Sequence, residues 1–214
     1  GSAGQFLQLE SIEGENSKLS WQTMNLNDIP YIQFNGQQFE NSLIIGLDNS
    51  DKLSNANKNV GIGVEVFSAL EDGDNNIALG FKSLEELVSG YGNVSIGNQA
   101  LEDNNAGSRN TAVGNLSLNN AKGKDNTAVG HKALEYINGS SNNNYNIAIG
   151  SESGFNVHNS TGSIYIGSQS KGFSSLNEDN RNIYRSNEIV IGHQAEGRGS
   201  NSITIGNKYN KNTY

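Results

Sequence analysis

Residues 110–114 read Asn110-Thr111-Ala112-Val113-Gly114, and this short pattern decides the fold because it recurs along the chain. Each copy places two aliphatic or β-branched residues on either side of one further residue and then adds a glycine. The ten copies end at Gly46, Gly63, Gly80, Gly97, Gly114, Gly130, Gly150, Gly167, Gly192 and Gly206. Successive glycines are 17, 17, 17, 17, 16, 20, 17, 25 and 14 residues apart. A period this regular predicts a stacked repeat in which each coil contacts only its neighbours.

The composition agrees with a solenoid better than with a globular domain. The 214 residues are 34% hydrophobic and 17% charged, with 26 glycines and a single proline. This apolar share is low for one large core, but a solenoid stabilises itself coil by coil. We therefore expect an all-β chain that forms a parallel β-roll, or β-solenoid, of about ten short coils. Coils this thin also favour oligomerisation.

The net charge, the lack of cysteine and the lack of long apolar runs exclude several classes of partner and site. The formal net charge is −8, which disfavours binding to a nucleic-acid backbone. The chain has no cysteine, so disulfides and thiolate metal sites are excluded. No apolar run approaches the roughly 18 residues that span a bilayer, and no signal peptide is visible. We expect no direct insertion into a membrane.

Each coil has an internal pattern when its glycine is numbered zero. Positions −3 and −1 are aliphatic or threonine, and position −2 is often small. Side chains alternate along a strand, so we expect −3 and −1 to share a packed face and −2 to face a second, close layer. Positions +3 and +4 predict a second strand, and the first of these elements is displaced by two residues to Ser68-Ala69-Leu70. The other copies are Ser83-Leu84, Ala100-Leu101, Ser117-Leu118 and Ala133-Leu134.

Position −4 is asparagine in six consecutive coils. These residues are Asn59, Asn76, Asn93, Asn110, Asn126 and Asn146. Stacked amides would bond along the array as a ladder. Asparagine also tolerates the positive φ angle that turns require, so a role as a turn residue stays open. Both roles are structural.

The chain divides into four segments. Residues 1–4 resemble a remnant of cloning, and residues 208–214 form a polar tail. Residues 41–207 carry the repeat array. Residues 5–40 lack the repeat but alternate like strands, with a turn signal at Asn35-Gly36. We expect a small β cap that covers the edge of the first coil, or equally a joint to a preceding module.

The repeats resemble those of two kinds of fibrous protein. Asn126-Thr127-Ala128-Val129-Gly130-His131-Lys132-Ala133-Leu134 is similar to repeats in the heads of trimeric autotransporter adhesins and in the tail fibres of phages and contractile injection systems. The resemblance covers about 165 residues, and the common step of 17 is longer than in the adhesin heads. It implies a homotrimer with the glycine-ending strand nearest the threefold axis. The long form of the repeat looks more like the tail-fibre branch, which implies an extracellular place on a virion tail or an injection system. A bacterial surface adhesin is the alternative.

Catalytic chemistry finds little support in the sequence. His131 and His193 both follow a repeat glycine, which is a solvated turn position. The acidic pairs, such as Glu178-Asp179, lie in polar turns, so a glycan-degrading fibre is a weaker alternative. The turn Glu71-Asp72-Gly73-Asp74 matches neither the EF-hand loop nor the nonapeptide calcium repeat. We expect no enzyme, no cofactor and no metal site.

The two longest steps are the better candidates for function, because outer loops of solenoids often bind partners. Tyrosine and arginine among polar residues are typical of recognition surfaces. The candidate contact residues are Tyr136, Asn143 and Tyr145 in the 20-residue step and Asn180, Arg181, Tyr184 and Arg185 in the 25-residue step. The sequence therefore predicts a segment of a trimeric fibre that attaches to a cell-surface receptor, either a glycan or a protein, and adjoins neighbouring fibre modules.

Overall fold

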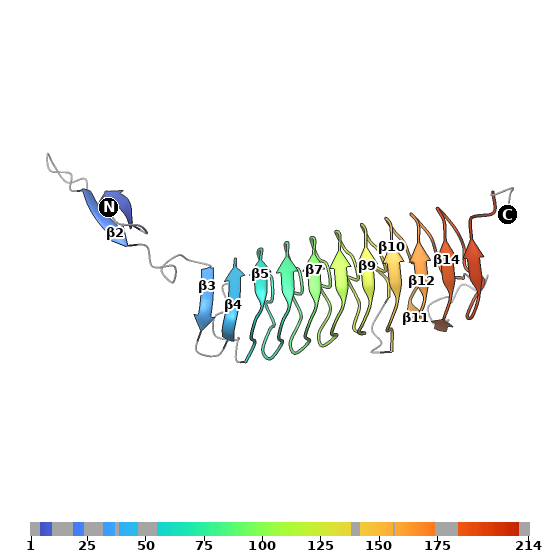
Figure 1. Ribbon diagram of the computed structural model, residues 1–214, viewed down its shortest axis with the longest axis horizontal. Helices are drawn as coiled ribbons and strands as arrows, with labels where there is room; N and C mark the ends of the chain where they lie inside the picture. Colours follow the sequence, from blue (N-terminus) through green and yellow to red (C-terminus); the bar gives the residue numbers. More distant parts are fainter. Residues whose placement is uncertain are drawn as a thin grey trace.

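The computed structural model describes residues 5–9, 19–23, 32–36, 39–46, 55–137, 142–155, 157–173 and 184–209, with side-chain burial described from residue 42 onward. In these segments the chain is all-β and contains no helix, which confirms the predicted fold class. Figure 1 shows the repeats stacked as a β-solenoid of about eight turns. The strands are β1 (Gln5–Leu9), β2 (Leu19–Thr23), β3 (Ile32–Gly36), β4 (Phe39–Ile45), β5 (Val60–Ile62), β6 (Ile77–Leu79), β7 (Val94–Ile96), β8 (Thr111–Val113), β9 (Thr127–Val129), β10 (Ile147–Ile149), β11 (Asn159–Thr161), β12 (Ile164–Ile166), β13 (Tyr184–Ser186), β14 (Ile189–Ile191) and β15 (Ile203–Ile205).

One sheet runs the length of the solenoid. Its order is β15-β14-β12-β10-β9-β8-β7-β6-β5-β4-β3, and every pair from β4 to β15 is parallel. Equivalent positions of successive repeats are in register, as in Thr111↔Thr127 and Ile147↔Ile164. Each copy of the repeat therefore contributes one strand. The register is kept across the steps of 20 and 25 residues, as the pairs Thr127↔Ile147 and Ile164↔Ile189 show.

The orientation of the strands corrects the predicted packing. Position −2 faces the inside of the coil and is buried in every copy but the last, where Thr204 is half-buried. Positions −3 and −1 face outward, and none of them is buried. The small residues at −2 therefore reflect a narrow coil interior, not a second sheet against the outer face. In most coils the interior leaves room for little more than an alanine at position −2 beside the side chains that enter from the opposite wall, and Ile44, Tyr165 and Val190 are the larger residues at this position.

The opposite wall is a turn, which corrects the predicted second strand. The leucines at position +4 have left-handed backbone, for example Leu84 at φ 52° and Leu101 at φ 50°. Left-handed residues interrupt the extended conformation that a strand requires. The turns still bond from coil to coil, since the Leu84 N–H donates to the Ala100 carbonyl at 3.1 Å. Leu70 is not a displaced copy of this element: it occupies position +7 like Leu87, and Phe67 occupies position +4.

The volumes of the inward side chains compensate one another. Phe67 fills the coil where position −2 is Gly61, because a Cβ at Gly61 would lie 2.9 Å from the Phe67 ring. Tyr165 is the largest residue at position −2, and Gly154 lies at position +4 of the coil before it. A Cβ at Gly154 would lie 3.5 Å from the Tyr165 ring and 2.5 Å from Leu134. The interior is packed by such exchanges of large and small residues.

The repeat glycines form a continuous column. All ten have positive φ, from 85° at Gly206 to 146° at Gly63. A Cβ at Gly97 would overlap the carbonyl oxygen of Gly114 in the next coil, and the same overlap recurs between other neighbours in the column. Both the backbone angle and the spacing of the coils therefore require glycine.

The asparagines at position −4 form a ladder, which decides between the two roles left open. All six are fully buried. Asn110 shows the repeated geometry: its Nδ2 donates to Asn93 Oδ1 at 3.2 Å and to the Gly123 carbonyl at 2.9 Å. The positive φ lies one residue earlier, at position −5, as in Arg109 (56°). Serines bound the ladder, with Ser42 Oγ accepting from the Asn59 N–H at 2.9 Å and Ser163 N–H donating to Asn146 Oδ1 at 3.1 Å.

The N-terminal segment divides into two parts. Strand β3 pairs antiparallel with β4 and so borders the first coil. Strands β1 and β2 form a separate antiparallel hairpin, with Leu9 opposite Leu19. The edge of the array is therefore paired by β3 and not by the hairpin.

Candidate interaction surface

The outer face of the long sheet is a row of aliphatic side chains that continues along the array. It consists of the side chains at positions −3 and −1 of the ten strands, a set we term the outer face. In chain order the −3 row is Leu43, Val60, Ile77, Val94, Thr111, Thr127, Ile147, Ile164, Ile189 and Ile203, and the −1 row is Ile45, Ile62, Leu79, Ile96, Val113, Val129, Ile149, Ile166, Ile191 and Ile205. Figure 1 shows the strands that carry these rows lying side by side in one layer.

The aliphatic side chains of the outer face are partly exposed to solvent. Interior members of the array such as Ile62, Ile96 and Ile149 expose 43%, 37% and 44% of their surface. No member of either row is charged, and the only polar members are Thr111 and Thr127. Soluble monomers rarely expose an apolar area this long and continuous, so the outer face is the candidate interaction surface.

The border of this face is polar along most of its length and apolar at one end. Val64 and Phe81, at position +1 of the first coils, are exposed at 59% and 42%. Next to Phe81, the Lys82 ammonium lies 3.0 Å from Glu85 and 3.3 Å from Glu65. Hydrogen bonds to these two carboxylates raise the pKa of Lys82, so it stays charged. The charges therefore frame the apolar rows without entering them.

A second surface lies along the corner that precedes the strands. Arg109 binds Asp125 through two bonds, from Nε at 2.6 Å and from Nη2 at 2.7 Å, and its guanidinium lies 5.4 Å from the Tyr91 ring centroid. The bonds from Arg109 lower the pKa of the Asp125 carboxyl. Tyr145, at 56% exposed, belongs to the same corner because it occupies the same repeat position as Arg109. Sequence reasoning missed Tyr91, although its aromatic ring in a polar turn was the available signal.

The candidate contact residues of the 20-residue step have different surroundings. Tyr136 and Tyr145 are exposed at 38% and 56%. The Tyr136 ring meets Phe155 edge to face, with ring centroids 6.2 Å apart. Asn143 is buried. Its Oδ1 accepts from the Ser160 N–H at 3.0 Å, and its Nδ2 donates to the His158 carbonyl. Asn143 is thus part of the internal bonding between coils.

The 25-residue step also divides into outward and inward residues. Asn180 and Arg181 lie outside the described residues. Tyr184 is 53% exposed, and its hydroxyl donates to Thr161 Oγ1 at 2.7 Å. Arg185 is 1% exposed and donates from Nε to the Phe173 carbonyl at 3.2 Å. The side chain expected to reach outward instead points inward, because strand alternation places it opposite Tyr184.

Arg185 belongs to a buried polar cluster that joins the two ends of the long step. Glu188 Oε1 accepts from the N–H groups of Phe173 at 3.3 Å and Gly199 at 2.8 Å. The Tyr165 hydroxyl donates to Glu188 Oε2 at 3.2 Å. Burial, reinforced by the Glu188 carboxylate, raises the pKa of Tyr165. Phe173 precedes the insertion and Arg185 follows it, so the cluster fixes the base of the loop.

The acidic turn that the sequence offered for calcium forms bonds between coils. Asp74, from the acidic turn considered as a calcium site, accepts the Asn57 N–H at 2.7 Å and so links two coils. In the described part of the chain, no group of three histidine or acidic residues is placed to hold a metal ion. Across the same residues, no helix has the length and apolarity to cross a bilayer.

Comparison with known proteins returned no match: no family model, curated protein or solved structure is detectably similar to this chain. The surfaces are therefore assigned from their geometry and chemistry.

Proposed function

We propose that this chain is a structural and receptor-binding segment of an extracellular homotrimeric fibre. The observation that carries the proposal is the outer face, an uncharged apolar surface that extends over ten strands of a regular array. Burying it between copies of the chain removes aliphatic surface from water. In-register repeats allow the same contact at each level, so association extends along the whole rod.

The choice of three chains rests on the resemblance of the repeats to trimeric fibres. In a trimer, the outer faces of three chains meet around one axis, with Thr111 and Thr127 forming the polar layers among aliphatic ones. A role as a tail fibre of a phage or an injection system is favoured by the long form of the repeat. The head of a bacterial surface adhesin is the second candidate, because its repeats share the Asn-Thr-Ala-Val-Gly pattern.

Receptor contact is assigned to the exposed residues at the two long steps. Tyr136 and Tyr184 present rings at the bases of the insertions, and amphipathic rings of this kind dominate binding energy in protein interfaces. Three copies around an axis would multiply a weak contact through effective concentration. The proposed role needs no catalytic group.

The first experiment measures the native mass by light scattering coupled to size-exclusion chromatography. A mass near three times 22.9 kDa supports the proposal, and a mass of one or two chains contradicts it. Val113→Lys places a charge at the centre of the outer face and is expected to yield monomers. Ser89→Lys, at an exposed turn position, is the matched control and should leave the mass unchanged.

Receptor contact is tested separately by loop replacement. Exchanging residues 174–183 for a short Gly-Ser turn keeps Phe173, Tyr184 and Arg185, so the base of the loop stays intact. The variant should keep the oligomeric mass and lose binding to the target cells. Unchanged cell binding would remove this loop from the proposal.

A further inference from the structure

Within the described residues, strand β15 forms the C-terminal edge of the sheet, and the strands before it define which of its backbone groups point away from the array. Across the array, the N–H at position −3 donates forward to the next coil, from Leu43→Asn59 at 2.8 Å to Ile189→Ser202 at 2.9 Å. The carbonyl at position −1 accepts from the next glycine, as in Gly206→Ile191 at 2.7 Å. Strand β15 is the last member of the sheet within the described residues.

The edge therefore presents a specific set of backbone groups. Residues of a parallel strand point their N–H and carbonyl alternately to the two neighbours. Ser202 and Gly206 bond backward to β14, so the backbone groups of Ile203 and Ile205 point away from it. Unpaired edge groups of this kind are templates for another strand.

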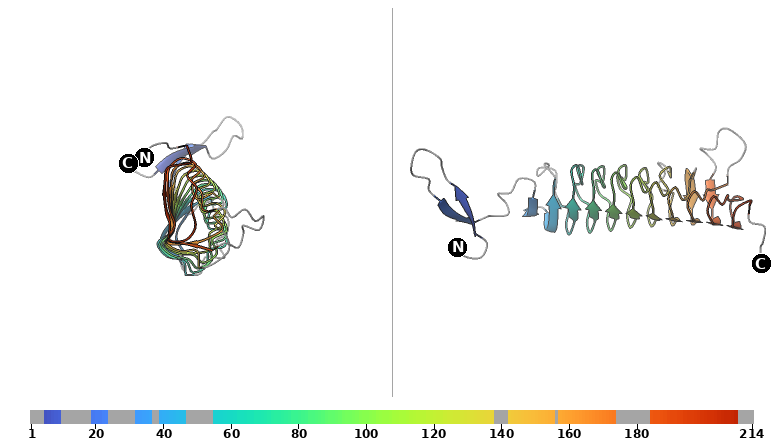
Figure 2. Two further views of the ribbon diagram at one scale, coloured as in Figure 1. Left: turned by 90° about the vertical axis from the view of Figure 1, so that its right-hand side faces the viewer. Right: turned by 90° about the horizontal axis from the view of Figure 1, so that it is seen from above.

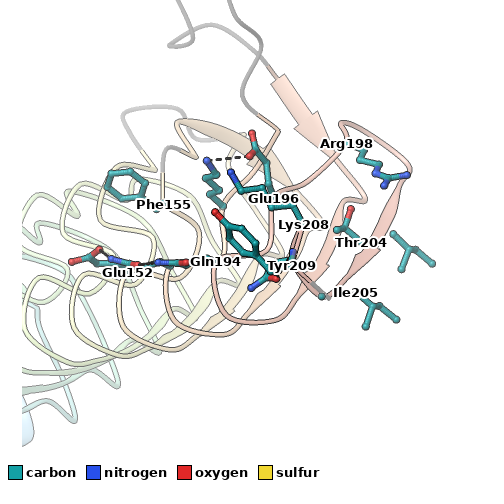
Figure 3. A pocket seen from close by; sticks show the side chains of 14 residues that line it. Glu152, Phe155, Gln194, Glu196, Arg198, Thr204, Ile205, Lys208 and Tyr209 are labelled. Carbon is teal, nitrogen blue, oxygen red and sulfur yellow. Dashed lines mark hydrogen bonds and ion pairs between the residues drawn. The ribbon is translucent and has the colours of Figure 1, made fainter. Parts of the chain in front are cut away.

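The side chains at this edge also lack the cover that interior coils have. Ile203 and Ile205 are 66% and 69% exposed, against 37–44% for the exposed isoleucines of interior strands. Thr204 Oγ1 is buried without a hydrogen-bond partner among the described residues. A hollow of about 980 Å³ lies at this end, and its lining includes Thr204, Ile205, Arg198 and Tyr209. Figure 3 shows these side chains.

The two ends of the sheet differ. Strand β3 runs antiparallel to the array, so the parallel register stops at the N-terminal end. At the C-terminal end β15 keeps the register of β14, from Ile189↔Ile203 to Ile191↔Ile205. Figure 1 shows the strands of the array pointing in the same direction up to this end, and Figure 2 shows the coils stacked one after another along the same axis.

We propose that the β15 edge is a docking site for one further parallel strand with the apolar-small-apolar-glycine pattern of the array, supplied by the adjoining fibre module. Such a strand would accept from the Ile203 N–H and donate from its glycine N–H to the Ile205 carbonyl. Its aliphatic residues would extend the outer face. The adjoining module as the source rests on the proposed function, whereas the strand chemistry rests on the edge alone.

The probe is a fluorescein-labelled peptide with the sequence of residues 142–150, which contains one complete strand of the array. Fluorescence anisotropy with the full-length protein should show saturable binding with one peptide per chain. The forward and backward alternation defines two matched controls. N-methylation at Ala148, whose N–H points backward, should abolish binding, and N-methylation at Ile147, whose N–H points forward, should leave it intact.

The protein side is tested with two variants of one residue. Ile203→Pro removes the outward N–H and keeps the bonds that β15 makes to β14, because edge strands tolerate proline there. It should weaken peptide binding about tenfold, as expected for the loss of one hydrogen bond. Ile203→Ala keeps the N–H, so its affinity for the peptide should stay close to that of the parent protein. Thermal melts of both variants confirm that the array remains folded.

Each outcome decides the proposal. The proposal is supported if binding is weakened by Ile203→Pro and abolished by N-methylation of the peptide at Ala148 but not at Ile147. Absence of saturable binding, or binding that ignores both N-methylation and Ile203→Pro, overturns it. The readout is counted per chain and does not depend on the oligomeric mass, so a failure of the trimer and a failure of the docking edge are distinguishable.

Discussion

The side-chain amide of Asn110 donates to the side-chain carbonyl of Asn93 at 3.2 Å, although the two residues are 17 positions apart. The same oxygen accepts the Asn110 backbone N–H at 3.0 Å. One asparagine thus satisfies both the side chain and the main chain of the next coil. The repetition of this link explains how a narrow interior with few large apolar residues holds successive coils in register.

Removing one rung should therefore destabilise the whole array. Asn110→Ala deletes the acceptor of the Asn126 N–H and Nδ2, which bond to it at 3.0 and 3.1 Å. The buried N–H is left without this acceptor, whereas Nδ2 keeps its bond to the Asn143 carbonyl at 2.8 Å. We expect a loss of about 3 kcal/mol in the free energy of unfolding, since each buried unpaired group costs about 1–3 kcal/mol. Urea denaturation measures it. Asn115→Ala, at an exposed position, is the control and should change stability by less than about 0.5 kcal/mol.

The glycine column predicts a difference between two glycines with positive φ. Gly97 has φ 143° and no room for a Cβ against Gly114, whereas a Cβ at Gly92 (φ 67°) would lie 3.5 Å from Arg109. Gly92→Ala should cost about 1–2 kcal/mol, the penalty of left-handed backbone alone. Gly97→Ala should cost clearly more, because the coils must also separate. Equal losses in thermal melts of the two variants would show that coil spacing plays no part.

Arg185 is expected to act on stability and not directly on receptor contact. Arg185→Met keeps most of the side-chain volume but removes the buried donor to Phe173, so a loss of about 2 kcal/mol follows. Arg198→Met, at an exposed arginine, is the control. Tyr184→Ala should show the reverse behaviour, with weaker cell binding and little change in stability. A stability-neutral Arg185→Met that lowers binding would restore Arg185 as a contact residue.

The Arg109–Asp125 pair predicts the sign of a pH dependence. Because Arg109 lowers the pKa of Asp125 below the ordinary 3.8, the pair stabilises the fold above that value. The contribution is lost as the pH falls through the lowered pKa. Asp125→Asn should therefore lower the melting temperature at pH 7 and have no effect at a pH below the folded-state pKa. The shift should be small, since the Arg109 side chain is 42% exposed and solvent screens the pair.

Asp103 predicts the opposite sign. Burial, together with Glu86 and Glu102, raises the pKa of its carboxyl above 3.8. The charged form is thus penalised in the folded state above the raised pKa, and the penalty disappears below 3.8. Asp103→Asn should increase the melting temperature at pH 7 and leave it unchanged at pH 2. A decrease at pH 7 would indicate that the carboxylate makes a favourable contact.

The sequence by itself determined the repeat, its period and the strand in each copy. A glycine at a fixed distance after alternating aliphatic residues specifies a turn and a strand locally, and repetition at 17 residues implies stacking. These properties depend on neighbours along the chain, which is why the ten strands were predictable. The ladder was also visible as a possibility, because stacking places equivalent asparagines together.

Only the tertiary structure decided which way each side chain faces. Alternation separates position −2 from −3 and −1 but assigns neither set to the interior, so the outer face was predicted as a packed one. The coil interior is too narrow for two aliphatic residues per strand opposite Leu84 or Phe67, so the small residue turns inward and the large pair outward. The turn at Leu84 and the buried place of Arg185 follow in the same way from contacts between coils. Such contacts depend on the distance between chain segments, which local sequence does not encode.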